Sequence, residues 1–232
     1  MHPANPLDTH EAGTGEDTVA KIFESLRTSI IAGEIAPGQV INSVEIANHF
    51  GTSRTPVREA LLILNQYGLI TLEARRRPRV AEVSVKAIRD LYALRTAMHA
   101  YISEAIVQSA PDDALRTLRA LAAELVERFA GQSNEQHLLN VETYLATEAR
   151  LCGNDVVLDV LDSLKWKISW FRRLGLMSRE QLGVLAEDRL RVADAYLERD
   201  ARLAEALNRS MLRKAGQYCE MNFVRSSARA SK

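Results

Sequence analysis

Residues 53–61, Ser53-Arg54-Thr55-Pro56-Val57-Arg58-Glu59-Ala60-Leu61, determine how the first third of this 232-residue chain folds. A proline stands near the first helical position of this stretch, and apolar residues at helical spacing continue as far as Gly68, so a helix begins here. A shorter helix is expected over 44–50, with Ser43 as its N-cap. Two short helices joined by a tight turn that contains glycine predict a helix-turn-helix.

The segments on either side complete a small domain. A helix is expected over 19–31, where apolar residues recur at helical spacing. Beyond the helix-turn-helix, residues 69–72 and 79–83 have the composition of short strands, and the arginine-rich segment 73–78 joins them as a hairpin. Residues 18–82 are therefore predicted to form a winged helix-turn-helix domain.

Basic and polar side chains cluster on the two elements that such a domain presents to DNA. The first turn of the second helix combines hydroxyl and guanidinium groups with the positive end of the helix dipole, which suits phosphates and major-groove edges. The hairpin tip adds arginines that can reach the adjacent backbone or minor groove. The alternative is that these arginines are ordinary solvent-exposed side chains without a binding role, which explains their clustering on these two elements less well. The predicted DNA-binding residues are Ser53, Arg54, Thr55, Arg58, Arg75, Arg76, Arg77 and Arg79.

These motifs resemble a known family. Glu34-Ile35-Ala36-Pro37-Gly38, Val44-Glu45-Ile46-Ala47 and residues 53–61 are similar to the DNA-binding domain of GntR-family bacterial transcription regulators. The resemblance implies that Arg54 and Arg58 contact guanines or phosphates and that the wing enters the minor groove. Many relatives carry glycine at the wing tip, where this chain carries arginines.

The rest of the chain contains no second strand-rich region. Long helical patterns separated by short breaks predict an antiparallel six-helix bundle over residues 83–224, so the fold class is mainly α. The expected helices cover 85–109, 112–130, 134–152, 154–174, 179–198 and 200–223.

This bundle resembles the FCD effector domain of the FadR subfamily of GntR regulators, in its six-helix, VanR-like form. Most FCD domains hold a metal through an aspartate, a histidine four residues later, and two further histidines. The matching positions here are Val141, Leu145, Arg189 and Met211. Apolar side chains cannot supply the ligands that zinc, manganese or nickel requires, and arginine repels a cation. We therefore expect no metal and no other cofactor.

Three helices of the bundle each direct one charge toward the core. Arg95, Glu148 and Arg189 interrupt otherwise apolar helical faces. One carboxylate against two guanidinium groups leaves a positive charge, which predicts a small anionic effector with a carboxylate or phosphate group. Nearby polar residues could add hydrogen bonds. The predicted effector-binding residues are Tyr92, Arg95, His99, Tyr144, Glu148, Arg189 and Asn208.

Two alternatives stay open for these residues. Glu148 could form a closed structural pair with one arginine while the other arginine extends to solvent, which would make the protein a ligand-independent DNA-binding regulator. Trp166 and Trp170 lie on a different face from the core stripe of their helix, and are either additional core or a subunit contact.

Composition sets the remaining expectations. The chain has 30 basic and 30 acidic residues and a formal net charge of zero, but residues 1–17 contain four acidic and no basic residues, and 54–79 contain six arginines against two glutamates. We expect disordered tails over 1–17 and 225–232. Two distant cysteines, no signal-peptide pattern and no long apolar run indicate a cytoplasmic protein without a membrane span.

The predicted function is that of a ligand-responsive transcription regulator. A single helix-turn-helix buries little surface on DNA, so a homodimer on a palindromic operator is expected, most simply as a repressor. Catalytic motifs such as GxSxG, HExxH or a phosphate-binding loop do not occur in the sequence, which argues against an enzyme.

Overall fold

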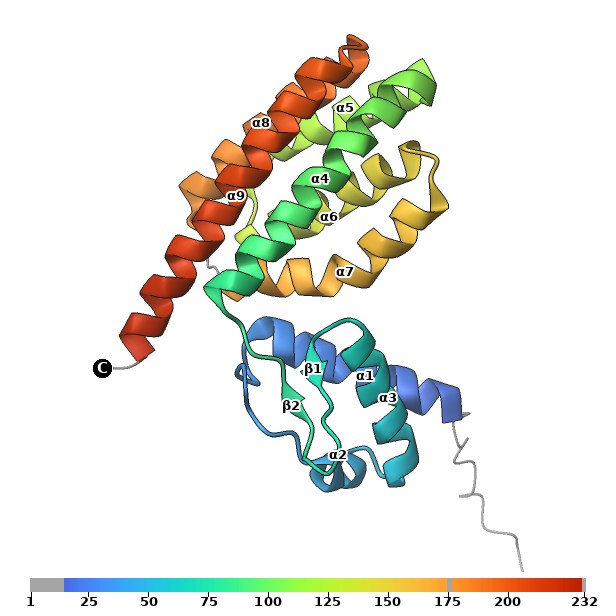
Figure 1. Cartoon of the computed structure of the whole chain (residues 1–232), viewed down its shortest axis with the longest axis vertical. Helices are drawn as coiled ribbons and strands as arrows, with labels where there is room; N and C mark the ends of the chain where they lie inside the picture. Colours follow the sequence, from blue (N-terminus) through green and yellow to red (C-terminus); the bar gives the residue numbers. More distant parts are fainter. Residues whose placement is uncertain (1–14, 175–176, 231–232) are drawn as a thin grey trace, which may run out of the picture. The chain divides into compact units, whose positions relative to one another are not determined.

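The computed structural model describes residues 15–174 and 177–230. The chain forms two compact units that divide between Ala81 and Glu82 (Figure 1). The first is a winged helix-turn-helix and the second consists of helices. The fold is thus mainly α, as the sequence predicts.

The first unit packs three helices around a small apolar core. Its helices are α1 (Gly15–Ala32), α2 (Ser43–His49) and α3 (Arg54–Gln66). The core lies mainly between α1 and α3, and side chains such as Ile22 and Leu64 have no exposed surface. The Asn42 side chain caps α2 by accepting a hydrogen bond from the Val44 amide at 3.1 Å, whereas Ser43, the expected cap, is the first helical residue. Asparagine caps a helix at least as well as serine, and it stands one position earlier.

The wing contains two very short strands and a third backbone segment. β1 (Ile70–Thr71) pairs antiparallel with β2 (Arg79–Val80), with Ile70 opposite Val80. The connection between α1 and α2 adds to the other side of β2, because the Gly38 amide donates to the Val80 carbonyl at 3.0 Å and the Val80 amide donates to the Gln39 carbonyl at 2.9 Å. The wing is therefore attached to the helical core through Gly38 and Gln39, which the sequence did not assign to a strand.

The second unit contains the six helices predicted for it, joined by short connections (Figure 1). α4 packs mainly against α9, α5 against α8, and α8 against α9. A short 3-10 turn, Phe129–Gly131, follows α5. The helices are α4 (Val85–Ser109), α5 (Asp112–Glu127), α6 (Asn134–Leu151), α7 (Asp155–Leu174), α8 (Arg179–Leu197) and α9 (Ala201–Ala230).

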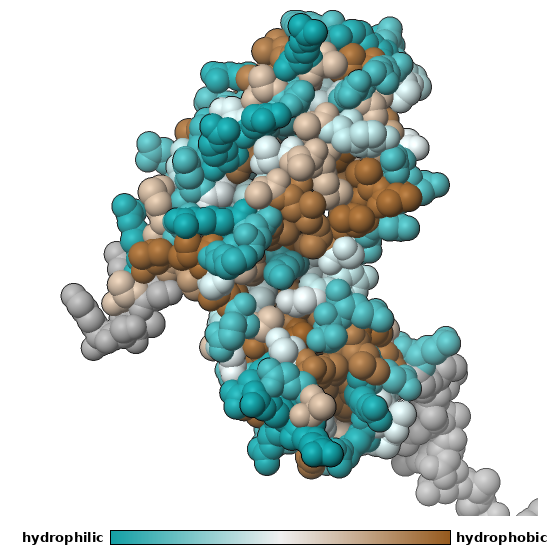
Figure 2. All heavy atoms as spheres, in the orientation of Figure 1, coloured by the Kyte–Doolittle hydropathy of each residue, from teal (hydrophilic) through white to brown (hydrophobic). Residues whose placement is uncertain are grey.

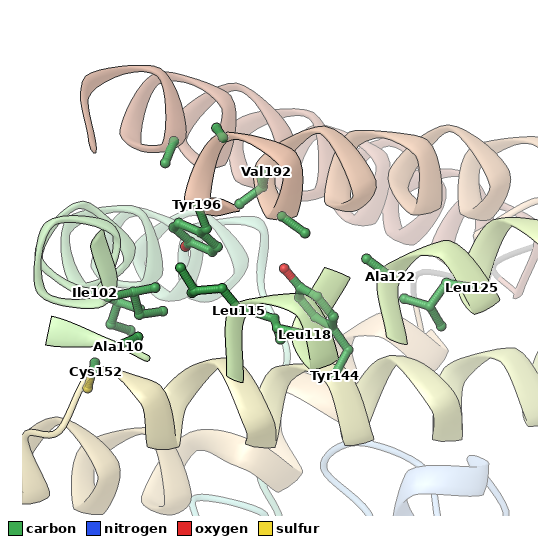
Figure 3. Packing of buried hydrophobic residues seen from close by; sticks show 14 of the residues in the cluster. Ile102, Ala110, Leu115, Leu118, Ala122, Leu125, Tyr144, Cys152, Val192 and Tyr196 are labelled. Atoms are coloured by element: carbon green, nitrogen blue, oxygen red, sulfur yellow. The ribbon is translucent and has the colours of Figure 1, made fainter. Parts of the chain in front are cut away.

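Apolar side chains from these helices form the core of the second unit. Figure 3 shows Leu115, Leu118 and Val192 packed together with two tyrosines, Tyr144 and Tyr196. Both tyrosine rings are buried, so their hydroxyl groups lie inside the apolar core and need polar partners there. No helix within the described residues is long and apolar enough to cross a lipid bilayer.

The ends of the chain differ from the expected tails. α9 continues to Ala230, although residues 225–232 were predicted to be disordered; residues 225–230 contain no glycine or proline, and alanine and arginine favour helix. At the other end α1 begins at Gly15, because Glu16 and Asp17 in its first turn complement the helix dipole. The remainder of the predicted acidic tail, residues 1–14, lies outside the described residues, as do residues 231–232.

Candidate DNA-binding surface and effector site

The first turn of α3 presents polar and basic side chains on the surface. Ser53, Arg54, Thr55 and Arg58 are all exposed. Ser53 occupies the N-cap position with extended backbone, but its side chain makes no capping hydrogen bond. Its hydroxyl and the amide groups of the first turn are thus available to an anion at the positive end of the helix.

The four predicted wing arginines are exposed but have different partners. Arg76 forms an ion pair with Glu73 at 2.6 Å. The Arg79 guanidinium donates to the Gly38 carbonyl at 3.1 Å, which attaches it to the α1–α2 connection. Arg75 has a left-handed backbone with a φ of 62°, so it occupies the turn of the hairpin tip.

Besides Arg79, which donates to a backbone carbonyl, four arginines of this unit have no carboxylate partner among the described residues. Among the ion pairs within the described residues, none involves Arg54, Arg58, Arg75 or Arg77. Exposed arginines without intramolecular partners can form bidentate contacts with phosphates or guanine edges at little cost. The surface thus has the chemistry that recognition of DNA requires.

In the second unit, the three charges expected to point inward are buried. The exposed fractions are 2% for Arg95 on α4, 1% for Glu148 on α6 and 5% for Arg189 on α8. Three different helices therefore place ionisable groups in the core of one unit. Burial of this kind is costly unless each charge is paired.

Glu148 has neutral partners. The Tyr196 hydroxyl donates to Glu148 Oε1 at 2.9 Å, and His99 Nδ1 lies 3.7 Å from Glu148 Oε2. The Asn208 amide in turn donates to the Tyr196 hydroxyl at 2.8 Å and to the Ser103 hydroxyl at 3.0 Å. Burial raises the pKa of Glu148, and the Tyr196 hydrogen bond and the two buried arginines partly oppose this.

The two buried arginines have no carboxylate partner within 4 Å among the described residues. Arg189 donates one hydrogen bond to the Leu185 carbonyl at 3.1 Å, and the Arg95 guanidinium carbon lies 5.0 Å from the centre of the Tyr92 ring. Burial and the neighbouring charge of Arg172 lower the pKa of each to about 10. Both arginines therefore remain cations at neutral pH.

Arg172 on α7 is a third buried arginine, which sequence reasoning missed. Its exposed fraction is 8%, and it stands four residues after the buried Ile168. That spacing was the available signal, but an arginine beside Arg173 at a helix C-terminus resembles an ordinary solvated end. With Arg172 included, three guanidinium groups lie beside one carboxyl group, so the cluster carries an excess of positive charge whether or not Glu148 is ionised.

Several polar atoms in this region are buried without a hydrogen-bond partner. Native proteins leave few such atoms, and each one points to a missing partner such as water or a ligand. His99 belongs to this set, and burial and the adjacent arginines lower its pKa to about 3, so its ring is neutral. The atoms are Arg95 Nε, His99 Nδ1, His137 Nε2, Tyr144 Oη, Trp170 Nε1, Arg189 Nε and Asn208 Oδ1.

A cavity of about 430 Å³ opens beside the cluster, between α4, α6 and α7. Of the seven predicted effector residues, Arg95 and His99 line it, and Arg172 lies in the same wall. Tyr144, Glu148, Arg189 and Asn208 lie in the core of the unit and not in the cavity wall. Of these four, Glu148 approaches the cavity residue His99.

Tyr92 has a different location from the other predicted residues. Its hydroxyl lies 3.2 Å from Cys219 Sγ, and its ring lines a separate groove between α4 and α9 together with Gly216. Burial raises the pKa of the Tyr92 hydroxyl to about 12. Tyr92 thus lies outside the wall of the cavity, although the face of its ring is next to the Arg95 guanidinium.

The residues at the four metal-ligand positions do not fit a metal. Val141 and Met211 are buried apolar side chains, Leu145 lines the cavity, and Arg189 carries a positive charge. In the part of the chain that the structure describes, no three His, Cys, Asp or Glu side chains come together as a candidate ligand set. The positive charge at this site comes from arginines.

The two tryptophans of α7 have different environments. Trp170 has no exposed surface and contacts Phe171, so it belongs to the core. Trp166 is half-buried and lines the cavity, with Lys165 Nζ 5.0 Å from the centre of its ring. A place in the cavity wall is a role that the sequence did not suggest for Trp166, and its expected subunit contact stays a prediction.

A winged helix-turn-helix followed by a helical unit with a charged core and a cavity defines a class of protein, the one-component transcription regulators. The chain matches the bacterial regulatory proteins of the gntR family over residues 18–80 and the FCD domain over residues 90–214. It belongs to the GntR family and, with its FCD domain, to the FadR-like regulators. Members of these families are transcription regulators and not enzymes.

Individual relatives agree with this assignment. An uncharacterised HTH-type transcriptional regulator of Streptomyces ambofaciens is 28% identical over 205 residues, which cover 83% of this chain and 80% of the relative. The gluconate operon transcriptional repressor of Bacillus licheniformis is 28% identical over 166 residues, which cover 70% of this chain and 66% of that repressor.

Solved structures share the fold at low identity. E. coli McbR/YncC superposes with a TM-score of 0.68 and 16% identity, covering 84% of this chain and 93% of that one. A Rhodococcus sp. RHA1 protein described as a GntR transcriptional regulator gives a TM-score of 0.70 and 19% identity, and the match covers 88% of this chain and 97% of that one. Similarity at this level shows the fold alone.

Proposed function

We propose that this protein is a cytoplasmic repressor that binds a palindromic operator as a homodimer and releases it when a small anionic metabolite enters the helical unit. The observation that carries the proposal is the buried cluster of three arginines with one glutamate beside a cavity. The cluster supplies uncompensated positive charge that an anionic ligand would neutralise.

The DNA-binding part rests on the exposed arginines of α3 and the wing. We assign the first-turn residues of α3 to the major groove and phosphates, and the wing arginines to the adjacent backbone or minor groove. Arg54, Arg58, Arg75 and Arg77 lack intramolecular ion pairs, which makes them the strongest candidates.

The homodimer part rests on exposed apolar side chains of α4 and α7. Leu94 and Tyr101 on α4 and Val156 and Val160 on α7 are between 37% and 71% exposed. The Asn154 amide donates to the Tyr101 hydroxyl at 2.8 Å, which places the two helices next to each other here. Figure 2 shows apolar residues gathered on one face of the second unit. A second copy would bury them and pair two recognition helices on a two-fold symmetric site.

The ligand-independent alternative requires contacts that the described residues do not make. A closed Glu148–arginine pair would bring these groups within 4 Å, but Glu148 is bonded to Tyr196 and approaches His99. An arginine that extends to solvent would be exposed, whereas Arg95 and Arg189 are buried. These observations favour the ligand-responsive function.

The coupling would pass through the short link 82–84 between the two units. Ser84 caps α4 by accepting a hydrogen bond from the Ala87 amide at 3.1 Å, so α4 starts directly after the link. A ligand that contacts Arg95 on α4 can therefore bias the dimer geometry that the operator requires.

Footprinting and mobility-shift measurements test this function. We expect the purified protein to protect a palindromic site near its own gene or a neighbouring operon, and transcription from that promoter to rise when the protein is removed. Sedimentation of the same sample should give the mass of a dimer. A protein that protects no palindrome, or that remains a monomer on its DNA site, would contradict the proposal.

The relative named as a gluconate operon repressor supports the sign of regulation. Its name does not fix the effector of this chain, because the chain's own cavity residues decide what can bind.

A further inference from the structure

The cavity between α4, α6 and α7 changes character from its inner end to its rim. The inner end carries the buried Arg95, His99 and Arg172. The walls are mainly apolar, and the rim carries exposed charged side chains. The apolar wall residues are Leu145, Ala146, Ala149, Leu158, Leu161, Trp166 and Ile168.

The inner end is equipped for one compact anionic group. Arg95 and Arg172 each carry a guanidinium group, and each is at least nine-tenths buried without a carboxylate partner among the described ion pairs. Arg95 Nε and His99 Nδ1 are among the unpartnered buried atoms. A carboxylate or phosphate accepts several hydrogen bonds and would supply the partners that these groups lack.

The walls offer few free polar groups for a second, hydroxyl-rich part of a ligand. The Glu142 carboxylate already accepts a hydrogen bond from the Ser169 hydroxyl at 3.0 Å. Arg150 Nε donates to the Ala146 carbonyl at 3.0 Å, and Lys165 pairs with Asp162 at 2.6 Å. A sugar hydroxyl placed against the leucine side chains would lose its hydrogen bonds to water without replacement.

We infer that the effector is an amphiphilic acid, with one carboxylate or phosphate group at Arg95 and Arg172 and a single apolar body against the α6 and α7 walls. This inference deepens the proposed function and rests on it, since it names the ligand class of the same site. The inference excludes polyhydroxylated sugar acids: their carboxylate could bind the arginines, but the apolar walls offer no partners for their hydroxyl groups.

Titration calorimetry with a matched set of small molecules tests this ligand class on the full-length protein. The probes are straight-chain monocarboxylates from acetate to decanoate, phenylacetate, hexyl phosphate, the amides of hexanoic and phenylacetic acid, and gluconate. We expect saturable binding whose affinity rises with apolar size up to the length that the cavity accepts. The two amides and gluconate should bind at least tenfold more weakly than the best acid. Comparing the affinities of hexyl phosphate and hexanoate shows whether the site prefers a phosphate or a carboxylate.

Variants assign the two ends of the ligand. Arg95→Gln and Arg172→Gln should each weaken the best acid at least tenfold, whereas Arg173→Gln, at an exposed arginine that pairs with Glu135, should not. Leu161→Ser should weaken the longest bound acid more than it weakens a short one, because it changes only the apolar wall. Thermal unfolding of each variant without ligand identifies any that does not fold, and the Leu161→Ser chain-length comparison needs only a folded protein.

Three results would overturn the inference: gluconate binding more tightly than every apolar acid, an amide binding as well as its acid, or no binding by any probe to a protein that still binds its operator. Operator binding by the same sample keeps the two proposals apart. If gluconate binds and causes release of the operator, the amphiphilic ligand class is wrong but the proposed function as a ligand-responsive regulator stands. An apolar acid that binds at Arg95 without changing operator affinity would support the ligand class and contradict the ligand-responsive function.

Discussion

The Tyr196 hydroxyl donates a 2.9 Å hydrogen bond to Glu148 Oε1, so the one acidic side chain buried among the described residues of the helical unit is held by a neutral residue. This arrangement leaves the three buried arginines without the partner that could have neutralised one of them. The stability of the unit and its response to an anion should therefore both depend on how Glu148 is held.

Replacing Tyr196 with phenylalanine should destabilise the helical unit by about 1–3 kcal/mol, because a buried carboxylate then loses its donor. Urea denaturation followed by tryptophan fluorescence measures this, since both tryptophans of the chain, Trp166 and Trp170, lie on α7. Tyr101→Phe is the control: it removes the hydroxyl of an exposed tyrosine, which accepts one hydrogen bond from the neutral Asn154 amide. A Tyr196→Phe variant no less stable than the Tyr101→Phe control would contradict the assigned role of this hydrogen bond.

The stability of the helical unit should fall as the pH falls below 6.5. The folded pKa of His99 is lowered to about 3, so His99 contributes stability above its unfolded value of 6.5 and loses it as the pH falls toward 3. Between pH 7.5 and pH 5 the expected loss from His99 alone is about 2 kcal/mol. Glu148 has the opposite effect on stability, because its pKa is raised in the folded state. Its contribution to the free energy of unfolding is present at low pH and is lost as the pH rises through its folded pKa.

The test compares the pH dependence of the wild type with that of His99→Gln by urea denaturation without effector. The variant should lose less stability between pH 7.5 and pH 5. His49→Gln, at an exposed position on α2, serves as the control and should keep the wild-type slope. Parallel slopes for the wild type and His99→Gln would show that His99 is not the neutral buried group described above.

Arg54→Ala and Arg58→Ala should each weaken operator binding by about 1–3 kcal/mol, because an arginine at the start of α3 can contact a guanine edge or a phosphate. Arg77→Ala in the wing should lower the affinity for specific and unrelated DNA alike and reduce the salt dependence by about one unit of slope. Arg116→Ala, an exposed arginine of the helical unit, is the control. Fluorescence anisotropy with labelled operator at several salt concentrations measures all four, and unchanged binding by both α3 variants would contradict the assigned surface.

Val156→Glu should convert the dimer into monomers and weaken operator binding at least tenfold. Val156 is 71% exposed, so the substitution costs the isolated fold little, but a dimer would bury the new charge in an apolar contact. Leu139→Glu makes the same change at a 52% exposed residue of α6 and should leave the dimer intact. Sedimentation velocity measures the mass of both variants. A Val156→Glu protein that is still a dimer would show that the dimer interface does not include this part of α7.

Local patterns predicted much of this structure from sequence alone. The helix-turn-helix followed from Pro56 and the apolar spacing around it, and helical periodicity identified the inward charges Arg95, Glu148 and Arg189. Periodicity reports which face of a helix is buried but not which neighbour covers it. For that reason Tyr92 was grouped with the effector residues, although its hydroxyl contacts Cys219 in a different groove.

Features that depend on contacts between distant segments were not predicted. The third segment of the wing forms because Gly38 and Gln39 meet Val80 across some forty residues, and nothing in the local sequence marks it. Arg172 was missed because a pair of arginines at a helix end is common on protein surfaces. Its burial depends on the packing of α7 against the rest of the unit.

The distribution of roles around the cavity has a consequence for engineering a biosensor from this protein. The arginines proposed to hold the anion are buried in the same unit as core side chains such as Tyr144 and Tyr196, where substitution would endanger folding. Leu158, Leu161 and Trp166 are only partly buried and line the cavity. A library confined to these three positions of α7 would retune which acid is detected while leaving its charged end, and the core that holds it, unchanged.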